Sequence, residues 1–377
     1  MLFSELLDGK NDIINRQPNN FSYSDYLAMI SHYLYSNNRE HLPYSDIAVR
    51  LINELVEQEN PYHANDGDNI LLNIFQDLNN IPFPSVENPE FQFVDLFAGI
   101  GGFRLAFQNL GGECVFSSEW DKDAQKTYQK NFGDMPFGDI TKRSIKNCIP
   151  EHFDVLCAGF PCQAFSIAGL QRGFDDARGT LFFDVATILR ERRPRAFFLE
   201  NVKNLQGHDK GKTFEVIYNT LTNDLGYHVF YKVLNSKTHG NVPQNRERIF
   251  IVGFDPEQVP NFLDFHFPES IPLNRTIHDI IDQTINEKSL FYTAEKFTHY
   301  DELERCMINP DTIYQWRRQY VRENQNNVCP TLTANMGEGG HNVPLIVTDD
   351  HRFRKLSPEE CLRFQGYPNN YQFANIA

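Results

Sequence analysis

The feature that most constrains the fold of this chain is an alternation of buried strands and helices that begins at Phe91. FQFVDLF (91–97) has the composition of a buried strand, AGIGG (98–102) is a glycine turn, and FRLAFQNL (103–110) begins a helix. Further strands are predicted at CVFSSEW (114–120), Phe153–Ala158, RAFFLENV (195–202) and YHVFYKVLN (227–235). Strands that alternate with helices are typical of a parallel sheet covered by helices. We therefore predict an α/β, Rossmann-like domain.

The loop after the strand Phe153–Ala158 contains a cysteine in a position suited to chemistry. Cys162 follows Gly159 and Pro161 directly, and a glycine-containing segment then leads to a helix that begins near Leu181. Open α/β sheets bind their ligands at the carboxyl ends of strands, which favours a reactive thiol here. A free cysteine is more often a small buried hydrophobic residue, so Cys162 alone leaves both interpretations open.

Acidic residues follow other strands of the same pattern. Glu119 lies twenty residues after Gly99, the spacing at which nucleotide-binding folds place an acid on ribose hydroxyls. Trp120 offers an aromatic face for a base, and Asp139 in FGDI stands at the end of a predicted third strand. The chain has no Lys-Ser/Thr phosphate loop, which favours a ligand with adenosine but no triphosphate. Each acid alone is equally consistent with a solvated loop residue or a helix cap.

The turn from Gly99 to Gly101 lets backbone approach a ligand, but position 104 is Arg, so the dinucleotide-binding pattern of glycines is incomplete. A nicotinamide oxidoreductase is an alternative that rests only on this turn and on Glu119.

Glu200 ends the strand RAFFLENV beside an apolar run. Partial burial would raise its pKa and favour the proton-donating form. A surface carboxylate satisfied by Asn201 or by backbone is the alternative.

Basic residues in the second half of the chain are candidates for contacts with phosphates or bases. Gln244, Arg246 and Arg248 are spaced two apart before an apolar strand, so they point the same way if the backbone is extended. Residues 255–350 lose the α/β rhythm, and aromatic residues there alternate with arginines that could read base edges, namely Arg317, Arg318 and Arg322. Simple surface charges and a loop-rich insert are the alternatives. Ser357 is predicted to cap a last helix that ends at Gly366.

Composition is neutral on DNA binding. The net charge is −15, but residues 1–90 hold 14 acids and 4 bases, so most of the excess lies there. Local basic clusters can still contact phosphates, because screening limits distant charges to a range of about 10 Å.

The seven scattered cysteines indicate a reduced, cytosolic protein without a structural zinc site. No apolar stretch approaches the length of a membrane span, and the N-terminus lacks the basic region of a signal peptide.

Residues 1–80 have the pattern of a helical segment. Ser22 or Ser24, Ser45 and Asp68 are candidate caps of three helices. A helical cap or dimerisation element is one interpretation, and a sequence-reading module is the other, although the acidity argues against the second. Residues 81–90 contain three prolines and are predicted to be a linker.

A set of ordered blocks in this chain resembles the DNA (cytosine-5)-methyltransferases, most closely those of bacterial restriction–modification systems. The resemblance runs from about Phe91 to Tyr371, and residues 255–350 match only as the variable target-recognition region. The blocks are FVDLFAGIGGFR, SSEWDKDAQKTY, GDI, AGFPCQAFSIAG, RGTLFFDV, FFLENV, PQNRERIFIVGF and RKLSPEECLRFQGYP.

The resemblance implies an S-adenosylmethionine-dependent methyltransferase that acts on double-stranded DNA, protecting a short sequence from a cognate restriction endonuclease. Cys162 matches the nucleophile of the family and Glu200 its acid. Arg248, with Arg246 and Gln244, matches the block that contacts the flipped cytosine, and Arg178 falls in the loop beyond the cysteine. The residues that match the cofactor site are Phe97, Gly99, Gly101, Glu119, Trp120, Asp139, Ile140, Pro161 and Leu181. No metal is implied.

These expectations give four regions: a helical extension (1–90), a catalytic domain (91–260), a target-recognition region (261–350) and a return toward the catalytic domain (351–377). Family members end in a further block, around a GNSV-like run, that this chain lacks. The sequence leaves three interpretations: a fragment, a split enzyme completed by a second polypeptide, or a catalytically incomplete protein that binds or regulates DNA. The expected location is the bacterial cytoplasm, at the nucleoid.

Overall fold

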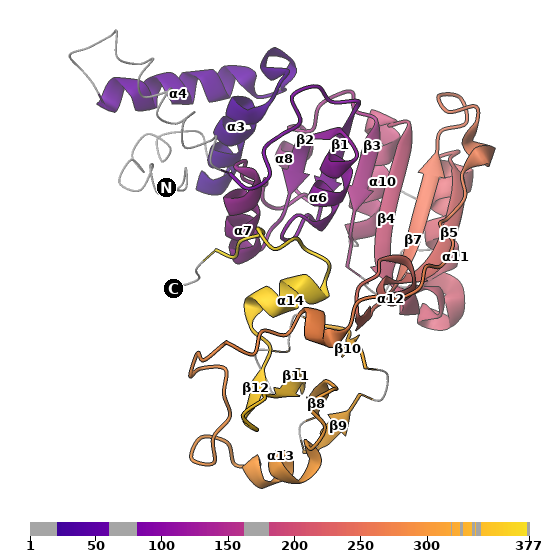
Figure 1. Ribbon diagram of the computed structural model, residues 1–377. Helices are drawn as coiled ribbons and strands as arrows, with labels where there is room; N and C mark the ends of the chain where they lie inside the picture. The colour runs from indigo at the N-terminus through magenta and orange to yellow at the C-terminus, as the bar shows by residue number, and fades with distance from the viewer. Residues whose placement is uncertain are drawn as a thin grey trace. The chain divides into compact units, whose positions relative to one another are not determined.

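The computed structural model of the chain describes residues 21–59, 81–161, 181–317, 319–324, 327–333, 336 and 341–374. The chain forms two compact units (Figure 1). The first contains residues up to 232, 249–265 and 374–377, and the second contains 233–248 and 266–373. The bounds of these units differ from those of the predicted regions. The N-terminal helices and residues 261–265 belong to the first unit, and residues 233–248 and 351–373 belong to the second.

A six-stranded sheet with the order β2-β1-β3-β4-β7-β5 forms the centre of the first unit. Strand β1 pairs in parallel with β2 and β3, and β3 pairs in parallel with β4. The predicted α/β class is therefore confirmed. The strands are β1 (Phe91–Leu96), β2 (Gly112–Ser118), β3 (Val155–Ala158), β4 (Ala196–Val202), β5 (His228–Asn235) and β7 (Glu247–Phe254).

Helices connect these strands. Phe103 and Phe107 of α6 pack on a buried cluster of Phe93, Cys114 and Cys157, which joins three strands to the helix. The predicted helix from Leu181 is confirmed. Helix α11 ends at Asn219, and the chain continues as a π-helical turn to Asp224. The helices are α6 (Gly102–Asn109), α7 (Lys122–Phe132), α8 (Arg143–Lys146), α10 (Leu181–Arg192) and α11 (Lys212–Asn219).

The strand predicted before Asp139 is wrong. Phe137 makes only an isolated parallel bridge to Ser118 at the end of β2. The chain between α7, which ends at Phe132, and α8, which begins at Arg143, is held there by backbone bonds of Phe137 to the end of β2 and by the bond of Gly138 N to Asp25.

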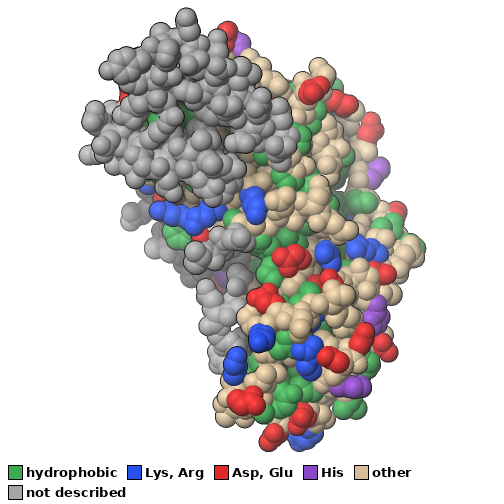
Figure 2. Space-filling view, turned by 60° about the vertical axis from the view of Figure 1, so that its left-hand side comes forward, with side chains coloured by type: hydrophobic (Ala, Val, Ile, Leu, Met, Phe, Trp, Pro, Cys, Tyr) green, Lys and Arg blue, Asp and Glu red, His purple; other side chains and the backbone are tan. Residues whose placement is uncertain are grey.

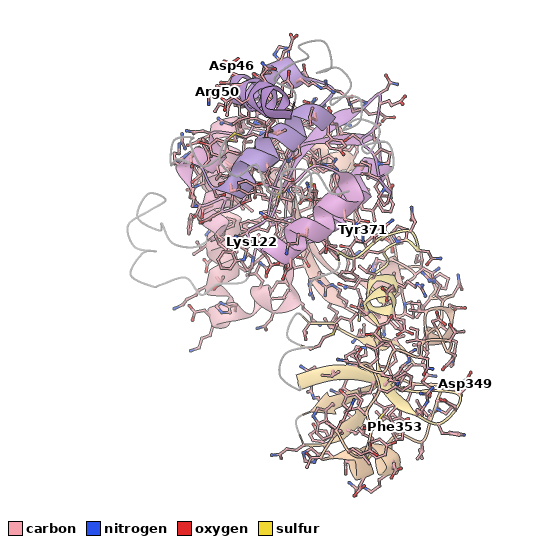
Figure 3. All side chains as sticks on the ribbon, turned by 90° about the vertical axis from the view of Figure 1, so that its left-hand side faces the viewer. Asp46, Arg50, Lys122, Asp349, Phe353 and Tyr371 are labelled. Carbon is pink, nitrogen blue, oxygen red and sulfur yellow. The ribbon has the colours of Figure 1, made fainter. Side chains whose placement is uncertain are left out.

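Two of the three predicted N-terminal helices are confirmed, and the third falls on residues outside those described. Helix α3 (Tyr23–Tyr35) begins with a capping box in which Ser22 and Asp25 bond reciprocally. Helix α4 (Ser45–Glu59) buries Ala48, Leu51 and Leu55. Its exposed Asp46 and Arg50 lie one turn apart (Figure 3). Within the described part of the chain, no helix is long and apolar enough to cross a membrane.

The second unit is built on a four-stranded antiparallel sheet with the order β12-β11-β8-β9. A short parallel pair, β6 and β10, lies in the same unit. The strands are β6 (Gln244–Asn245), β8 (Tyr314–Arg317), β9 (Val321–Glu323), β10 (Cys329–Pro330), β11 (His341–Val347) and β12 (Phe353–Lys355). The helices are α12 (Ser236–His239), α13 (Tyr300–Cys306) and α14 (Pro358–Phe364). Single 3-10 turns occur at 39–41, 203–206, 208–211, 262–264 and 277–279.

Acidic and basic side chains are interspersed on the face drawn in Figure 2. Arg193 and Arg195, just after α10, pair with carboxylates of the first unit. Arg193 Nε lies 2.8 Å from Asp255 Oδ2, and Arg195 Nη1 lies 3.4 Å from Asp154 Oδ1. These two arginines therefore support the fold.

The second unit contains a fully buried ion pair. Arg354 donates from Nη1 to Glu360 Oε2 at 2.7 Å and from Nη2 to Glu360 Oε1 at 2.8 Å. The same carboxylate accepts from the backbone N–H groups of Ser357 and Asp282, both at 2.8 Å. The pair thus connects β12, the predicted Ser357 cap of α14 and the loop at 282.

We predict that Arg354→Met destabilises the second unit by about 3–5 kcal/mol, because it leaves Glu360 buried without its counter-ion. Urea unfolding followed by Trp316 fluorescence measures this, since Trp316 is buried in the same unit. Arg305→Met is the matched control, because the Arg305–Glu302 pair on α13 is exposed at the arginine. Equal urea midpoints for wild type and Arg354→Met would contradict the prediction.

Candidate functional site

The turn between β1 and α6 is fixed by an acid from the neighbouring strand. The N–H of Gly99 donates to Glu119 Oε2 at 2.8 Å, and the other carboxylate oxygen accepts from Asp121 N at 2.8 Å. Phe97 adopts a φ of +55°. An aromatic residue in this left-handed region is strained, and such strain concentrates at functional sites. The spacing of twenty residues between Gly99 and Glu119 thus corresponds to a direct contact.

The two glycines of the turn have different surroundings. A Cβ on Gly101 would lie 2.2 Å from Phe132 Cε2, so this glycine lets α7 pack closely against the turn. Among the residues that the structure describes, none would lie within 4 Å of a Cβ on Gly99. Gly99 therefore borders open space at the carboxyl end of β1, where a ligand can approach the backbone.

Arg104 explains why the glycine pattern is incomplete. Its side chain is 1 % exposed, lies 3.1 Å from Asp134 Oδ2 and donates to Gln108 Oε1 at 2.8 Å. The guanidinium also lies over the ring of Phe132. Position 104 thus carries a buried ion pair where the dinucleotide pattern has a glycine, which weakens the oxidoreductase alternative.

The other predicted cofactor residues lie around the end of β2. Phe137 N donates to Ser117 O at 2.9 Å, and Glu119 N donates to Phe137 O at 2.8 Å, so the segment leading to Asp139 and Ile140 is bonded to this strand end. Trp120 is 81 % exposed and presents a free aromatic surface, whereas Ile140 is buried. Asp139 Oδ1 accepts from the N–H and hydroxyl of Thr141.

The structure brings Glu200 to the end of β3. Ala158, the last residue of β3, pairs with Leu199 of β4, so Glu200, the next residue of β4, lies beside Gly159. Glu200 Oε2 lies 3.6 Å from the position that a Cβ would take on Gly159. Asn201, which is 2 % exposed, donates from Nδ2 to Phe160 O at 2.7 Å.

Asn201 fixes the segment at Phe160, whereas the sequence indicated it only as a partner of Glu200. Its position directly after the acid of an apolar strand is the sequence feature that could have predicted a structural role near the site. Pro161 is exposed, and Leu181 is half-buried at the first position of α10. Cys162 and Arg178 lie outside the described residues.

The described residues that are predicted to contact DNA lie in the second unit, and their side chains differ in exposure. Arg246 and Arg248 are half-buried and donate to the carbonyls of Leu332 and Glu247, respectively. Gln244 departs from the prediction, because its side chain is fully buried and donates from Nε2 to Phe364 O at 2.8 Å. The pairing of β6 with β10 inside this unit turns the amide inward. In this structure the Gln244 side chain bonds to the backbone of its own unit and is not accessible to DNA.

Two of the three arginines predicted for target recognition are described. Arg322 is exposed on β9, and half-buried Arg317 on β8 bonds to Asn342. Arg318 lies outside the described residues.

Asp95 is a buried carboxyl group that the sequence analysis did not single out. It lies on β1 two residues before the strained Phe97 and is fully buried. Among the described residues, neither of its oxygens makes a hydrogen bond of ordinary geometry. Burial raises the pKa of Asp95 to about 8, although the neighbouring Arg104 acts in the opposite direction. A single acid inside FQFVDLF was the signal for it.

A cleft of about 400 Å³ lies elsewhere in the first unit, between the connection of α3 to α4 and the amino ends of β1 and β3. It is lined by His41, Gln92, Glu151 and His152, among others, and contains none of the predicted site residues. The chemistry predicted from the sequence is therefore at the opposite, carboxyl edge of the sheet.

We predict that Asp95 makes the protein less stable as the pH rises from about 4 to 8. The folded protein keeps the proton up to a pKa of about 8, whereas the unfolded chain releases it near the ordinary pKa of about 3.9. Unfolding therefore releases a proton throughout this window. Asp95→Asn should flatten the slope of melting temperature against pH, measured between pH 5 and 8. An unchanged slope would mean that Asp95 is ionised in the folded state.

Comparison with known proteins gives one consistent result. Residues 91–376 match the family model of the C-5 cytosine-specific DNA methylases. The chain is 49% identical over 289 residues to the Type II methyltransferase M.Bsp6I of Bacillus sp. (strain RFL6), covering 76% of this chain and 90% of that protein. It is 46% identical over 307 residues to the Type II methyltransferase M.HpaII of Haemophilus parainfluenzae, covering 75% and 81%.

A solved structure supports the fold independently. The Entamoeba histolytica methyltransferase EhMeth matches with a TM-score of 0.54 at 15% identity, covering 75% of this chain and 88% of that one. The family match covers both the glycine turn and the strand ends described above, whereas residues 1–90 lie outside it. The chain therefore belongs to the C-5 cytosine-specific DNA methylases, and it is an S-adenosylmethionine-dependent DNA cytosine-5 methyltransferase of the restriction–modification type.

Proposed function

We propose that Cys162 and Glu200 carry out the methylation chemistry on a cytosine flipped out of double-stranded DNA. The observation that carries this proposal is the bond from Asn201 Nδ2 to Phe160 O at 2.7 Å. This bond connects β4, which carries Glu200, to Phe160, two residues before Cys162. Flipping exposes carbon 5, which is unreachable in the base stack, at a cost of about a few kcal/mol.

In the proposed reaction, the thiolate of Cys162 forms a bond to carbon 6 of the cytosine while Glu200 gives a proton to N3. Carbon 5 becomes nucleophilic because the ring is no longer aromatic. When bound, S-adenosylmethionine would supply the methyl group, which is electrophilic because it is attached to a positively charged sulfur. With S-adenosylhomocysteine as the leaving group of methyl transfer, loss of the carbon 5 proton to solvent, breakage of the bond between sulfur and carbon 6, and return of the N3 proton to the Glu200 carboxylate restore the aromatic ring, the free thiolate and the acid.

We propose that the edge around the glycine turn binds the cofactor. The open space at Gly99, the carboxylate of Glu119 and the exposed ring of Trp120 fit a ligand with a ribose and a base. Glu119 would bind the ribose hydroxyls, and Asp139 with Ile140 the adenine edge. The remaining proposed contacts are Phe97 on the adenine and Pro161 with Leu181 toward the sulfonium.

The DNA contacts are proposed to come from arginines, which apart from Arg178 belong to the second unit. Arg246 and Arg248 would contact the flipped cytosine and its backbone, and Gln244 would position them through its bond to Phe364. Arg317 and Arg322, with Arg318 and Arg178 outside the described residues, would contact the target sequence. The proposed place of action is the nucleoid DNA of a bacterial cytoplasm, in keeping with the bacterial relatives. Nothing in the comparisons supports a second polypeptide.

A duplex with 5-fluorocytosine at the target position tests the chemistry. Fluorine cannot leave carbon 5 as the proton does, so the bond from Cys162 to carbon 6 should persist in a denaturation-resistant complex. We expect Cys162→Ala to lose the complex, and Glu200→Gln to slow its formation by about 100-fold or more. Cys306→Ser is the matched control, because Cys306 lies on α13 in the second unit. A complex that persists in Cys162→Ala would refute the assignment.

The two turn glycines give a second test. Gly101→Ala should lower the melting temperature, because its Cβ would lie 2.2 Å from Phe132. Gly99→Ala should fold with a cost of about 1–2 kcal/mol for its left-handed backbone, yet bind S-adenosylmethionine at least tenfold more weakly in calorimetry. Wild-type affinity in folded Gly99→Ala would show that the cofactor does not approach this glycine.

A further inference from the structure

Helix α3 contacts the segment 133–138, which connects α7 to the proposed adenine-binding residues. Met135 N donates to Ser31 Oγ at 2.9 Å, and the hydroxyl of Ser31 in turn donates to Ala28 O. Tyr35 packs against Gly133, where a Cβ would lie 2.2 Å from the tyrosine ring. Side chains of α3 therefore contact the backbone of the segment directly.

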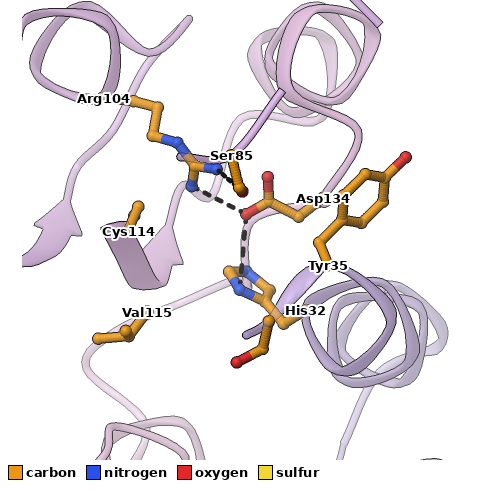
Figure 4. A pocket seen from close by; sticks show the side chains of 8 residues that line it. His32, Tyr35, Ser85, Arg104, Cys114, Val115 and Asp134 are labelled. Carbon is orange, nitrogen blue, oxygen red and sulfur yellow. Dashed lines mark hydrogen bonds and ion pairs between the residues drawn. The ribbon is translucent and has the colours of Figure 1, made fainter. Parts of the chain in front are cut away.

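The middle of α3 joins a buried polar cluster (Figure 4). His32 Nδ1 lies 3.5 Å from Asp134 Oδ2, the oxygen that also pairs with Arg104 of α6. Burial lowers the pKa of His32, so the ring is neutral near pH 7 and adds no second charge to the ion pair. The His32 ring also stacks on Phe137, with centroids 5.4 Å apart.

Asp25, at the start of α3, makes the contact closest to the cofactor residues. Its side chain is 2 % exposed. Oδ2 accepts from the N–H and hydroxyl of Ser22, at 2.8 and 2.6 Å, and Oδ1 accepts from the backbone N–H of Gly138 at 2.9 Å. One carboxylate therefore caps the helix and fixes the residue immediately before Asp139.

The opposite side of the segment is bonded to β2, as shown by the paired hydrogen bonds of Phe137 with Ser117 and Glu119. The segment is thus enclosed between the strand end that bears Glu119 and helix α3. The β2 contacts lie within the family match of 91–376, whereas Asp25 lies outside it.

We propose that Asp25 is a positioning residue for S-adenosylmethionine, acting through the N–H of Gly138 to set the backbone of Asp139 and Ile140. This inference rests on the proposed cofactor role of those two residues. It makes α3 part of the cofactor-binding edge, so the N-terminal helices serve the catalytic unit directly.

The test compares two variants of the same helix start. Asp25→Ala removes the acceptor of the Gly138 N–H, and we expect the dissociation constant of S-adenosylmethionine to rise about tenfold, as for loss of a hydrogen bond to a charged group. The rate at saturating cofactor and the affinity for duplex DNA should stay unchanged. Asp25→Asn keeps an acceptor in place and should recover most of the affinity. Hydrogen exchange of the Gly138 amide should accelerate in Asp25→Ala.

Ser22→Ala is the matched control, because it removes the helix cap but leaves the Asp25–Gly138 bond available. It should lower the melting temperature without weakening cofactor binding. Wild-type cofactor affinity in folded Asp25→Ala, or an equal loss in Ser22→Ala, would overturn the inference. Glu119→Ala separates this failure from failure of the proposed site: if it also leaves binding unchanged, the cofactor site itself is misassigned.

Discussion

The hydrogen bond from the N–H of Gly99 to the carboxylate of Glu119 is the contact on which the catalytic edge depends. It forms because β1 and β2 are adjacent parallel strands, so their carboxyl ends meet. The same strand end bonds to the segment at Phe137. On the other side of β1, the pairing with β3 and then β4 brings Glu200 to the segment that leads into Cys162. Strand order alone therefore collects the proposed ribose, adenine and acid groups at one edge.

Local signals in the sequence were sufficient for these elements. The glycines at 99 and 101 predicted the turn, and the S-x-x-E pattern at Ser357 predicted the cap of α14, both of which the structure contains. The spacing to Glu119 predicted an acid at this edge, but its bond to Gly99 was found only in the structure. Such features depend on neighbouring residues or on the regular geometry of parallel strands, so a single sequence carries enough information to predict them.

Features that depend on distant packing were not predictable in this way. The burial of Gln244 results from β10, 85 residues further along the chain by the pairing of Cys329 with Gln244. The assignment of 233–248 to the second unit has the same origin. Likewise, nothing in the spacing of residues 22–35 indicates that Asp25 bonds to Gly138. Cys162, on which the chemistry rests, lies outside the described residues, so its role still derives from the sequence and the family.

The charge distribution is consistent with an enzyme that acts on DNA despite a net charge of −15. Part of the acidity of the N-terminal region serves structure, since Asp25 is buried as a cap and a backbone acceptor. Two arginines just after α10, Arg193 and Arg195, are paired with carboxylates. The relevant quantity for DNA contact is therefore the local charge around Arg246, Arg248 and Arg322, and the total charge says little about it.

The most direct test of this account is to map cytosine methylation in DNA. Bisulfite sequencing of genomic DNA from a bacterial host without cytosine methylation, expressing this chain, reports carbon-5 methylation at every site. For the wild-type chain, the account predicts cytosines that resist bisulfite conversion within one short sequence. For Cys162→Ala at equal expression, it predicts none. Unprotected DNA from cells that contain the folded wild-type protein, or the same protected sites with Cys162→Ala, would contradict it.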